Sequence, residues 1–187
     1  MLSAYREAYN YRDKRMFENI QWIVEQEESL GRGKVFVFGH NQHISKQMTL
    51  GRHLMGMHLA AEYGESYFAI GTDLLNGTFI AWQPDSGLKR FAMKNEASEL
   101  NDSFAQMSMP TCVIHTNDYA EYGEEMATIL TGFQPMVSIG LTFDKQYVDA
   151  SESFTLPIIP ISAYDAIIFV RDSTPATIVR PQAFIRG

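Results

Sequence analysis

The sequence has few of the residues that mark disulfide-rich or membrane-spanning proteins. It contains one cysteine, Cys112, so no disulfide can form within the chain, and a cytoplasmic location is expected. No stretch reaches the roughly 18 uninterrupted apolar residues of a membrane span. Pro160, Ser162 and Asp165 interrupt the most apolar region, residues 158–170. The polar N-terminal segment lacks the apolar core of a signal peptide, so no membrane association is expected.

Basic residues are also in short supply. The chain has 15 Lys and Arg against 22 Asp and Glu, a formal net charge of -7. Nucleic-acid binding needs a basic patch or stripe, so DNA and RNA are not expected as partners. The Gly-x-Ser-x-Gly turn of many serine hydrolases is missing, which argues against that mechanism. Hydrophobic residues make up 45% of the chain, enough for one core, so a single domain is expected over residues 1–187.

The first part of the chain predicts a helix, a strand and a second helix. Residues 2–30 contain no Pro or Gly and place apolar side chains at helical spacing, which predicts one long helix that ends at Gly31. Residues 34–39 form a nearly continuous run of β-branched and aromatic side chains, which is typical of a strand buried on both faces. A further helix is predicted over about 51–63, with Gly64 at its end.

Strands and helices alternate in the rest of the chain. Asn76-Gly77 predicts a tight turn that joins strands at 66–73 and 78–82 into a hairpin, followed by a loop to about Arg90. This alternation predicts an α/β fold with a mixed, largely parallel sheet and helices on its faces. The remaining predicted elements are helices at 96–107 and 119–130 and strands at 111–115 and 165–170.

Two histidines follow the first predicted strand. His40 and His43 lie three residues apart on a polar loop, at the carboxyl edge of the predicted sheet, where α/β folds gather ligands. Imidazole suits proton transfer near neutral pH, so the pair is a candidate for acid-base catalysis. Two alternatives stay open. The pair could have a structural role, or it could bind a metal with a third ligand such as His53 or His115.

A polar pair lies on the predicted first helix. Steps of 100° per residue place Arg12 and Asn19 within about 20° of each other, inside an apolar arc that includes Tyr5 and Ile23. A guanidinium buried there needs a partner, because an unpaired buried charge is costly. That partner is either a ligand or, in a structural ion pair, an acid such as Asp13.

Two segments resemble motifs of the erythromycin esterase family. Residues 12–19, with Trp22, match its RDxxMxxN...W helix, and residues 40–44 match its HNxHI element at the expected distance downstream. The similarity extends over about residues 9–177. Looser matches follow in the family's order at Met55-Gly56, residues 67–71 and residues 164–169.

The resemblance implies an α/β hydrolase of carboxylic esters, in the best-known members the lactone of macrolide antibiotics, a resistance reaction. It implies a histidine that draws a proton from water with no cofactor and no obligatory metal, while other His and Arg groups polarise the ester. On this chain, His43 and His40 are then the expected catalytic residues. Arg12, Asn19 and Asn41 are expected to bind the small-molecule ester or lactone.

Members of that family are much longer than this chain, and their principal histidine base lies in an upstream element. The resemblance therefore implies that the chain is the C-terminal portion of such a protein. A sheet without its first strands exposes edges and apolar surface, so self-association or pairing with an N-terminal partner segment is expected. The alternatives to an active esterase are a catalytically silent half-protein and a metal-dependent hydrolase that uses His40 and His43.

Overall fold

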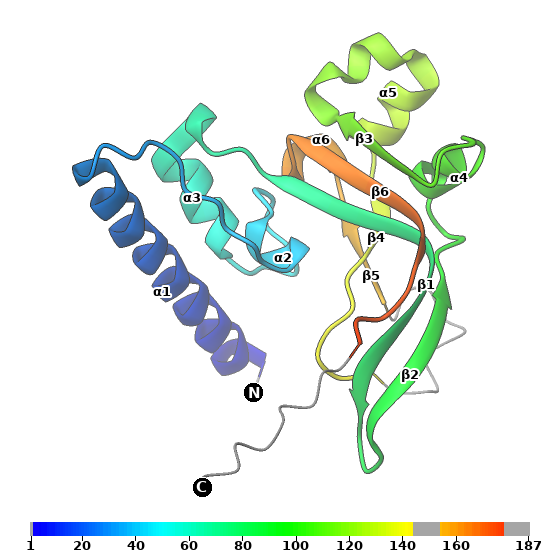
Figure 1. Ribbon diagram of the computed structural model, residues 1–187, viewed down its shortest axis with the longest axis horizontal. Helices are drawn as coiled ribbons and strands as arrows, with labels where there is room; N and C mark the ends of the chain where they lie inside the picture. Colours follow the sequence, from blue (N-terminus) through cyan, green and yellow to red (C-terminus); the bar gives the residue numbers. More distant parts are fainter. Residues whose placement is uncertain (1, 144–153, 178–187) are drawn as a thin grey trace, which may run out of the picture.

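The computed structural model describes residues 2–143 and 154–177. Its elements form two groups that lie side by side (Figure 1). The long helix α1 (Leu2–Ser29) packs along α3 (Met55–Tyr63), and the one-turn helix α2 (Asn41–Ile44) lies between this pair and the main sheet. None of the helices in the described ranges is long and apolar enough to cross a membrane.

A four-stranded sheet forms the second group. Its strand order is β2 (Gly87–Lys94), β1 (Ile70–Gln83), β6 (Ala166–Ser173) and β3 (Thr111–His115). β1 runs parallel to β6, whereas the β1–β2 and β3–β6 pairs are antiparallel. The predicted α/β fold with a mixed sheet is confirmed, but the sheet is not largely parallel as predicted, because two of its three strand pairings are antiparallel.

Short helices and a second, two-stranded sheet pack against the main sheet. The two strands are β4 (Gln134–Val137) and β5 (Thr155–Ile158), which pair antiparallel. Sequence analysis missed both, because each is four residues long and contains a proline, which is unusual inside a strand. The helical elements here are α4 (Glu99–Ala105), η2 (Thr116–Tyr122), α5 (Glu124–Thr131) and α6 (Pro160–Ala163), whereas η1 (Gly64–Ser66) is exposed and continues α3.

The larger hydrophobic core lies between the main sheet and these helices. Phe104 of α4 stacks on Phe169 of β6, with ring centroids 4.4 Å apart, and both are almost fully buried. Ile167 of β6 and Leu130 of α5 belong to the same core cluster, and each is 0% exposed. Burial of these side chains, the main driving force of folding, fixes β6 and with it the parallel partner β1.

Several predicted elements are confirmed. The long first helix is α1, the strand at 111–115 is β3, the helix at 96–107 contains α4, and the last strand is β6. The helix predicted at 119–130 is divided into η2 and α5, because Gly123 between them has a φ of 90°. The helix predicted from residue 51 begins at Met55, since Leu50 and Gly51 have positive φ values and form a turn before it.

The hairpin predicted at Asn76-Gly77 is wrong. β1 continues through both residues as one 14-residue strand, and the turn to β2 lies instead at residues 84–86, where Asp85 has a φ of 60°. A glycine is needed at position 77 because the Leu74 side chain packs against it, and a Cβ there would lie 2.8 Å from Leu74 Cδ1. The predicted loop up to Arg90 is a turn at residues 84–86, followed by the first residues of β2.

The strand predicted at residues 34–39 is also wrong. Phe36 and Phe38 are 86% and 92% exposed, and the segment pairs with no strand among the described residues. A strand forms only where a neighbouring backbone offers hydrogen bonds. At Thr72, on the β1 edge that faces away from β6, the backbone N–H and C=O form hydrogen bonds with the Asn41 side-chain amide and not with a neighbouring strand.

Candidate active site

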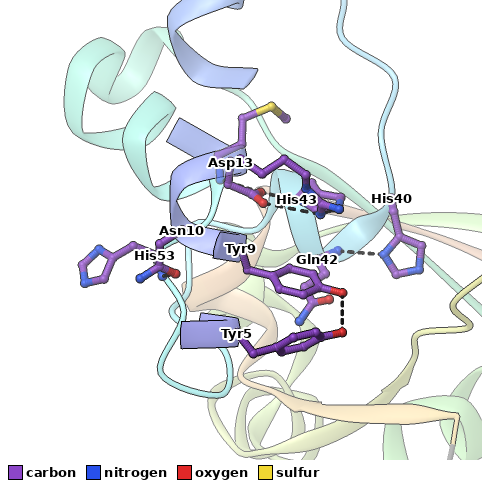
Figure 2. A network of polar contacts seen from close by, with 10 residues as sticks. Tyr5, Tyr9, Asn10, Asp13, His40, Gln42, His43 and His53 are labelled. Atoms are coloured by element: carbon purple, nitrogen blue, oxygen red, sulfur yellow. Dashed lines mark hydrogen bonds and ion pairs between the residues drawn. The ribbon is translucent and has the colours of Figure 1, made fainter. Parts of the chain in front are cut away.

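His43 lies on α2, a single helical turn held close to α1 and α3 (Figure 2). Gly56 permits this approach, because a Cβ at position 56 would lie 2.4 Å from the Ile44 carbonyl oxygen. Real side chains do not come so near, so only glycine fits at this contact. The close packing brings His43 against α1, where Asp13 faces it.

Asp13 and Arg12 contact the two ring nitrogens of His43. Nδ1 lies 2.6 Å from Asp13 Oδ1, and Nε2 lies 3.0 Å from Arg12 Nη2. A guanidinium carries donors only, so Nε2 is the acceptor and the proton of the neutral ring is on Nδ1, which donates it to the carboxylate. This tautomer leaves a lone pair on Nε2, as a general base requires.

Asp13 is the buried member of this group. Its side chain is 0% exposed, whereas those of Arg12 and His43 are 52% and 21% exposed. Oδ1 also accepts a hydrogen bond from the Met55 backbone N–H at 3.2 Å, and Oδ2 lies 3.5 Å from Arg12 Nη2 without a hydrogen bond among the described residues. The carboxylate is therefore fixed in the interior, while the imidazole and the guanidinium reach solvent.

The packed face of α1 differs from the prediction. Asp13 bonds to the start of α3, and the Phe17 ring stacks on His58 of α3 at a centroid distance of 5.5 Å. Arg12 and Asn19 are exposed, so the prediction that they lie at the centre of the packed face is wrong. The four-residue spacing of Asp13 and Phe17 matches α3, because residues four apart share one face of a helix.

His40 caps α2 at its N-terminus. Its Nδ1 accepts from the Gln42 backbone N–H at 3.3 Å, and its Nε2–H donates to the Ile139 carbonyl at 3.1 Å. Burial lowers the pKa of His40, the Ile139 hydrogen bond opposes this shift, and the nearby His43 adds to it. The two histidine rings lie 6.4 Å apart, but both nitrogens of His40 are engaged by backbone groups.

Asn41 connects α2 to the main sheet. Its Nδ2 donates to the Thr72 carbonyl at 2.5 Å, and its Oδ1 accepts from the Thr72 backbone N–H at 3.0 Å. The Tyr164 hydroxyl donates to the Asn41 carbonyl at 3.2 Å. The α2 turn is thereby tied to β1 and to the core. Of the residues predicted to form the site, Arg12, His40, Asn41 and His43 gather around α2, whereas no hydrogen bond or ion pair among the described residues joins Asn19 to them.

His40 and His43 are not part of a three-ligand metal site among the described residues. Within residues 2–143 and 154–177, no group of three or more His, Cys, Asp or Glu side chains is placed to hold a metal ion. The ring of His53 lies beside that of His58, with centroids 6.5 Å apart, and the ring of His115 lies beside that of Phe68 at 6.3 Å. Neither His53 nor His115 is therefore positioned as the third ligand that a site at His40 and His43 requires.

A second buried carboxylate, Asp73 of β1, lies close to α2. It is 0% exposed, and its Oδ1 accepts from the backbone N–H groups of Leu74 at 2.9 Å and Val137 at 3.0 Å. Oδ2 has no hydrogen-bond partner among the described residues. Burial raises the pKa of Asp73 to about 7, although the two backbone hydrogen bonds oppose the shift.

Sequence reasoning did not assign Asp13 to His43 and did not identify Asp73. From the sequence, Asp13 is expected only as an ion-pair partner of Arg12, although its position inside the helix motif is a signal for a role at the site. Asp73 lies on the inward face of a strand, where an acid has no local pattern that reveals its burial.

The sequence matches a family model described as erythromycin esterase over residues 2–173. No curated protein matches it. Among solved structures, a crystal structure of a protein from Bacillus cereus is similar with a TM-score of 0.78 and 26% sequence identity, covering 94% of this chain and 41% of that one.

Two further solved structures share the fold. A crystal structure of a succinoglycan biosynthesis protein has a TM-score of 0.74 at 17% identity, covering 91% of this chain and 40% of that one. The erythromycin esterase EreC, as a variant in its open conformation, has a TM-score of 0.56 at 18% identity, with coverages of 87% and 37%. The chain thus spans about two fifths of the length of these relatives, as the coverages of 41%, 40% and 37% state.

Proposed function

Because the chain belongs to the erythromycin esterase family, we propose that the protein hydrolyses carboxylic esters or lactones, with His43 as the base that activates water. The observation that carries the proposal is the position of His43 between a buried carboxylate and an exposed guanidinium. In such an Asp–His pair, Nε2 takes up a proton while the carboxylate stabilises the imidazolium that forms. A macrolide lactone is the substrate that the family's name suggests.

In the proposed reaction, His43 Nε2 accepts a proton from water, and the hydroxide oxygen forms a bond with the ester carbonyl carbon. The carbonyl electron pair moves to its oxygen, and the permanent positive charge of the Arg12 guanidinium stabilises that oxyanion. Collapse of the intermediate breaks the bond to the alkoxide, which takes the proton from Nε2. The products are a carboxylic acid and an alcohol, and the ring returns to its Nδ1–H form.

Arg12 has to leave His43 before this step, because its Nη2 occupies the Nε2 lone pair at 3.0 Å. The Arg12 side chain is 52% exposed, so the guanidinium can move on the solvent side of the site. A shift of the guanidinium from Nε2 to the substrate carbonyl would free the base and polarise the ester together. Substrate binding and base activation are coupled in this scheme.

We assign His40 and Asn41 to positioning and not to contact with substrate. Both ring nitrogens of His40 and both amide atoms of Asn41 are engaged by backbone groups that hold α2 in place. Asn19 is exposed on α1 and has no part in the proposed reaction.

The test is hydrolysis of phenyl acetate and of a macrolide lactone by the full protein and two histidine variants. A positioned acid-base group contributes about 10²–10⁴-fold, so His43→Gln should lower kcat at least about a hundredfold. His53→Gln is the matched control, because His53 is exposed and points away from His43 (Figure 2), and kcat should not change. Equal turnover of wild type and the His43 variant would remove His43 from the reaction.

Exposed apolar residues favour a second candidate, a half-protein that is silent until a partner segment covers it. Phe36 and Phe38 are largely exposed, and Ile70 and Val113 are 39% and 59% exposed on one face of the main sheet. Apolar surface of this kind usually marks an interaction site. Sedimentation and activity of the isolated chain decide between the candidates. An active monomer contradicts the half-protein, and an inactive, self-associated chain supports it.

A further inference from the structure

Two tyrosines and two arginines form a cluster beside His43. These residues, Tyr5, Tyr9, Arg12 and Arg52, are called the tyrosine–arginine cluster. The guanidinium carbons of Arg12 and Arg52 lie 4.8 and 4.5 Å from the centroid of the Tyr9 ring. The hydroxyl oxygens of Tyr5 and Tyr9 lie 3.0 Å apart. Figure 2 shows both phenol rings extending from α1 toward the side where His43 and Gln42 lie.

The cluster is built by one helix face and one strained turn. Tyr5, Tyr9 and Arg12 are spaced four and three residues apart, so they share a face of α1. A turn between Thr49 and Arg52, closed by a 3.1 Å hydrogen bond from the Arg52 N–H to the Thr49 carbonyl, returns Arg52 to this face. Leu50 in this turn has a φ of 55°, a left-handed conformation that residues with a Cβ rarely adopt. Such strain is concentrated at functional sites.

Within residues 2–143 and 154–177, the positive charge of the cluster is balanced only in part, by the ion pair of Arg12 with Asp13. No carboxylate among the described residues forms an ion pair with Arg52. The acid next to Arg12 is Asp13, which is buried and already bonded to His43. A third guanidinium, that of Arg6, lies 3.5 Å from the Cβ position of Gly51. Arginines are thus gathered on one surface of a chain whose net charge is -7.

Aromatic contacts hold these arginines in place but do not neutralise them. A cation–π contact uses the face of the guanidinium and leaves the N–H donors at its edge free. Guanidinium groups pair with carboxylate and phosphate through two parallel hydrogen bonds. One of the two hydroxyls of Tyr5 and Tyr9 donates to the other, so the pair adds one further donor at the same surface.

We propose that the tyrosine–arginine cluster binds an anionic group, a carboxylate or a phosphate, carried by the ester substrate. The inference rests on the proposed function and names its substrate class. Arg12 contacts both the Tyr9 ring and His43 Nε2, so an anion on the cluster lies next to the base. The reacting ester then sits a short chain length from the charged group.

The arrangement also explains how the base is released. An anion held by Arg52 attracts Arg12 and competes with His43 for its guanidinium N–H groups. Arrival of an anionic substrate therefore exposes the Nε2 lone pair.

The experiment measures anion binding separately from hydrolysis. Succinate and inorganic phosphate are titrated by calorimetry into the full protein, Arg52→Gln, Arg52→Lys and Arg32→Gln. Arg32 lies beyond the far end of α1 and pairs with Glu27, so its variant should bind as the wild type does. Loss of a charged hydrogen-bonding partner costs about 1.5–3 kcal/mol, so Arg52→Gln should bind at least about tenfold more weakly. Arg52→Lys should recover part of the affinity, and the tighter of the two anions identifies the recognised group.

Hydrolysis of monophenyl succinate and phenyl acetate is then compared. For the wild type, kcat/KM for the anionic ester should exceed that for the neutral ester. In Arg52→Gln this ratio should fall about tenfold, the same factor by which anion binding weakens. Absence of binding, or equal binding by wild type and Arg52→Gln, overturns the anion site. Arg52-dependent binding without hydrolysis of any ester supports the site and contradicts the proposed function. His43-dependent hydrolysis without preference for the anionic ester supports the proposed function and contradicts the site.

Discussion

Asp13 and His43, 30 residues apart in the sequence, are joined by a hydrogen bond of 2.6 Å between Oδ1 and Nδ1. The same carboxylate oxygen accepts the backbone N–H of Met55, so α1, α2 and α3 meet at one acid. Catalytic groups work best when their orientation is fixed before substrate binds. Here the packing of three helices holds Asp13 in place, and the Asp13 hydrogen bond sets the orientation of the imidazole.

Gly56→Ala should displace the α2 turn. The new Cβ would lie 2.4 Å from the carbonyl oxygens of Ile44 and Ser45, so the backbone must shift. Overpacking of this kind costs about 1–3 kcal/mol, which urea unfolding measures. Turnover should fall as well, because His43 moves with α2. Gly140→Ala, whose Cβ would meet nothing within 4 Å, is the matched control, and equal stability of the two variants would count against the close contact.

His40→Ala should reduce stability more than it reduces chemistry. The variant loses the side-chain cap of α2 and the link to Ile139, and loss of an N-cap costs about 1 kcal/mol. His40→Asn should restore most of the stability and the turnover, because asparagine is a preferred N-cap. Thermal unfolding and kcat for both variants provide the check. A loss of kcat as large as that of the His43 variant, without rescue by asparagine, would show that His40 takes part in proton transfer.

Asp73→Asn should flatten the dependence of stability on pH. Burial raises the pKa of Asp73 from 3.8 to about 7, so between these values the folded protein holds a proton that the unfolded chain releases. The stabilisation is complete below the unfolded value and is lost as the pH rises through 7. At about 1.4 kcal/mol per pKa unit the loss is up to about 4 kcal/mol.

Urea unfolding at pH 5 and pH 8 tests this. The wild type should lose stability over that interval, and Asp73→Asn should lose much less. Asp118→Asn, a change at an exposed acid of η2, should follow the wild type. Equal pH slopes for Asp73→Asn and wild type would contradict the account of this carboxylate.

Local sequence patterns predicted the elements whose structure depends on local residues. The unbroken helical spacing of residues 2–30 and the apolar run of β3 were sufficient for both elements. Gly77 was misread because Asn-Gly favours a tight turn locally, whereas the small residue is required by Leu74 packing against it from the same strand. Residues 34–39 have strand composition, but a strand also needs a partner edge, which composition does not encode.

The site could be predicted in part for the same reason. His40, Asn41 and His43 were identified because they lie in one short polar segment. Arg12 was identified too, although the face it was assigned to depends on which side of α1 meets α3. The pairing of Asp13 with His43 joins two segments far apart in sequence, so it became visible only with the packing of three helices.

The most direct test of the central claim is a double-mutant cycle on kcat/KM for ester hydrolysis with Asp13→Asn, His43→Gln and the combined variant. Residues that act as one unit have non-additive effects. Each single variant should lose at least about a hundredfold in kcat/KM, and the combined variant should be no slower than His43→Gln alone, with melting temperatures confirming that all three are folded. If the two losses multiply in the combined variant, Asp13 does not act through His43, and the catalytic pair proposed here is contradicted.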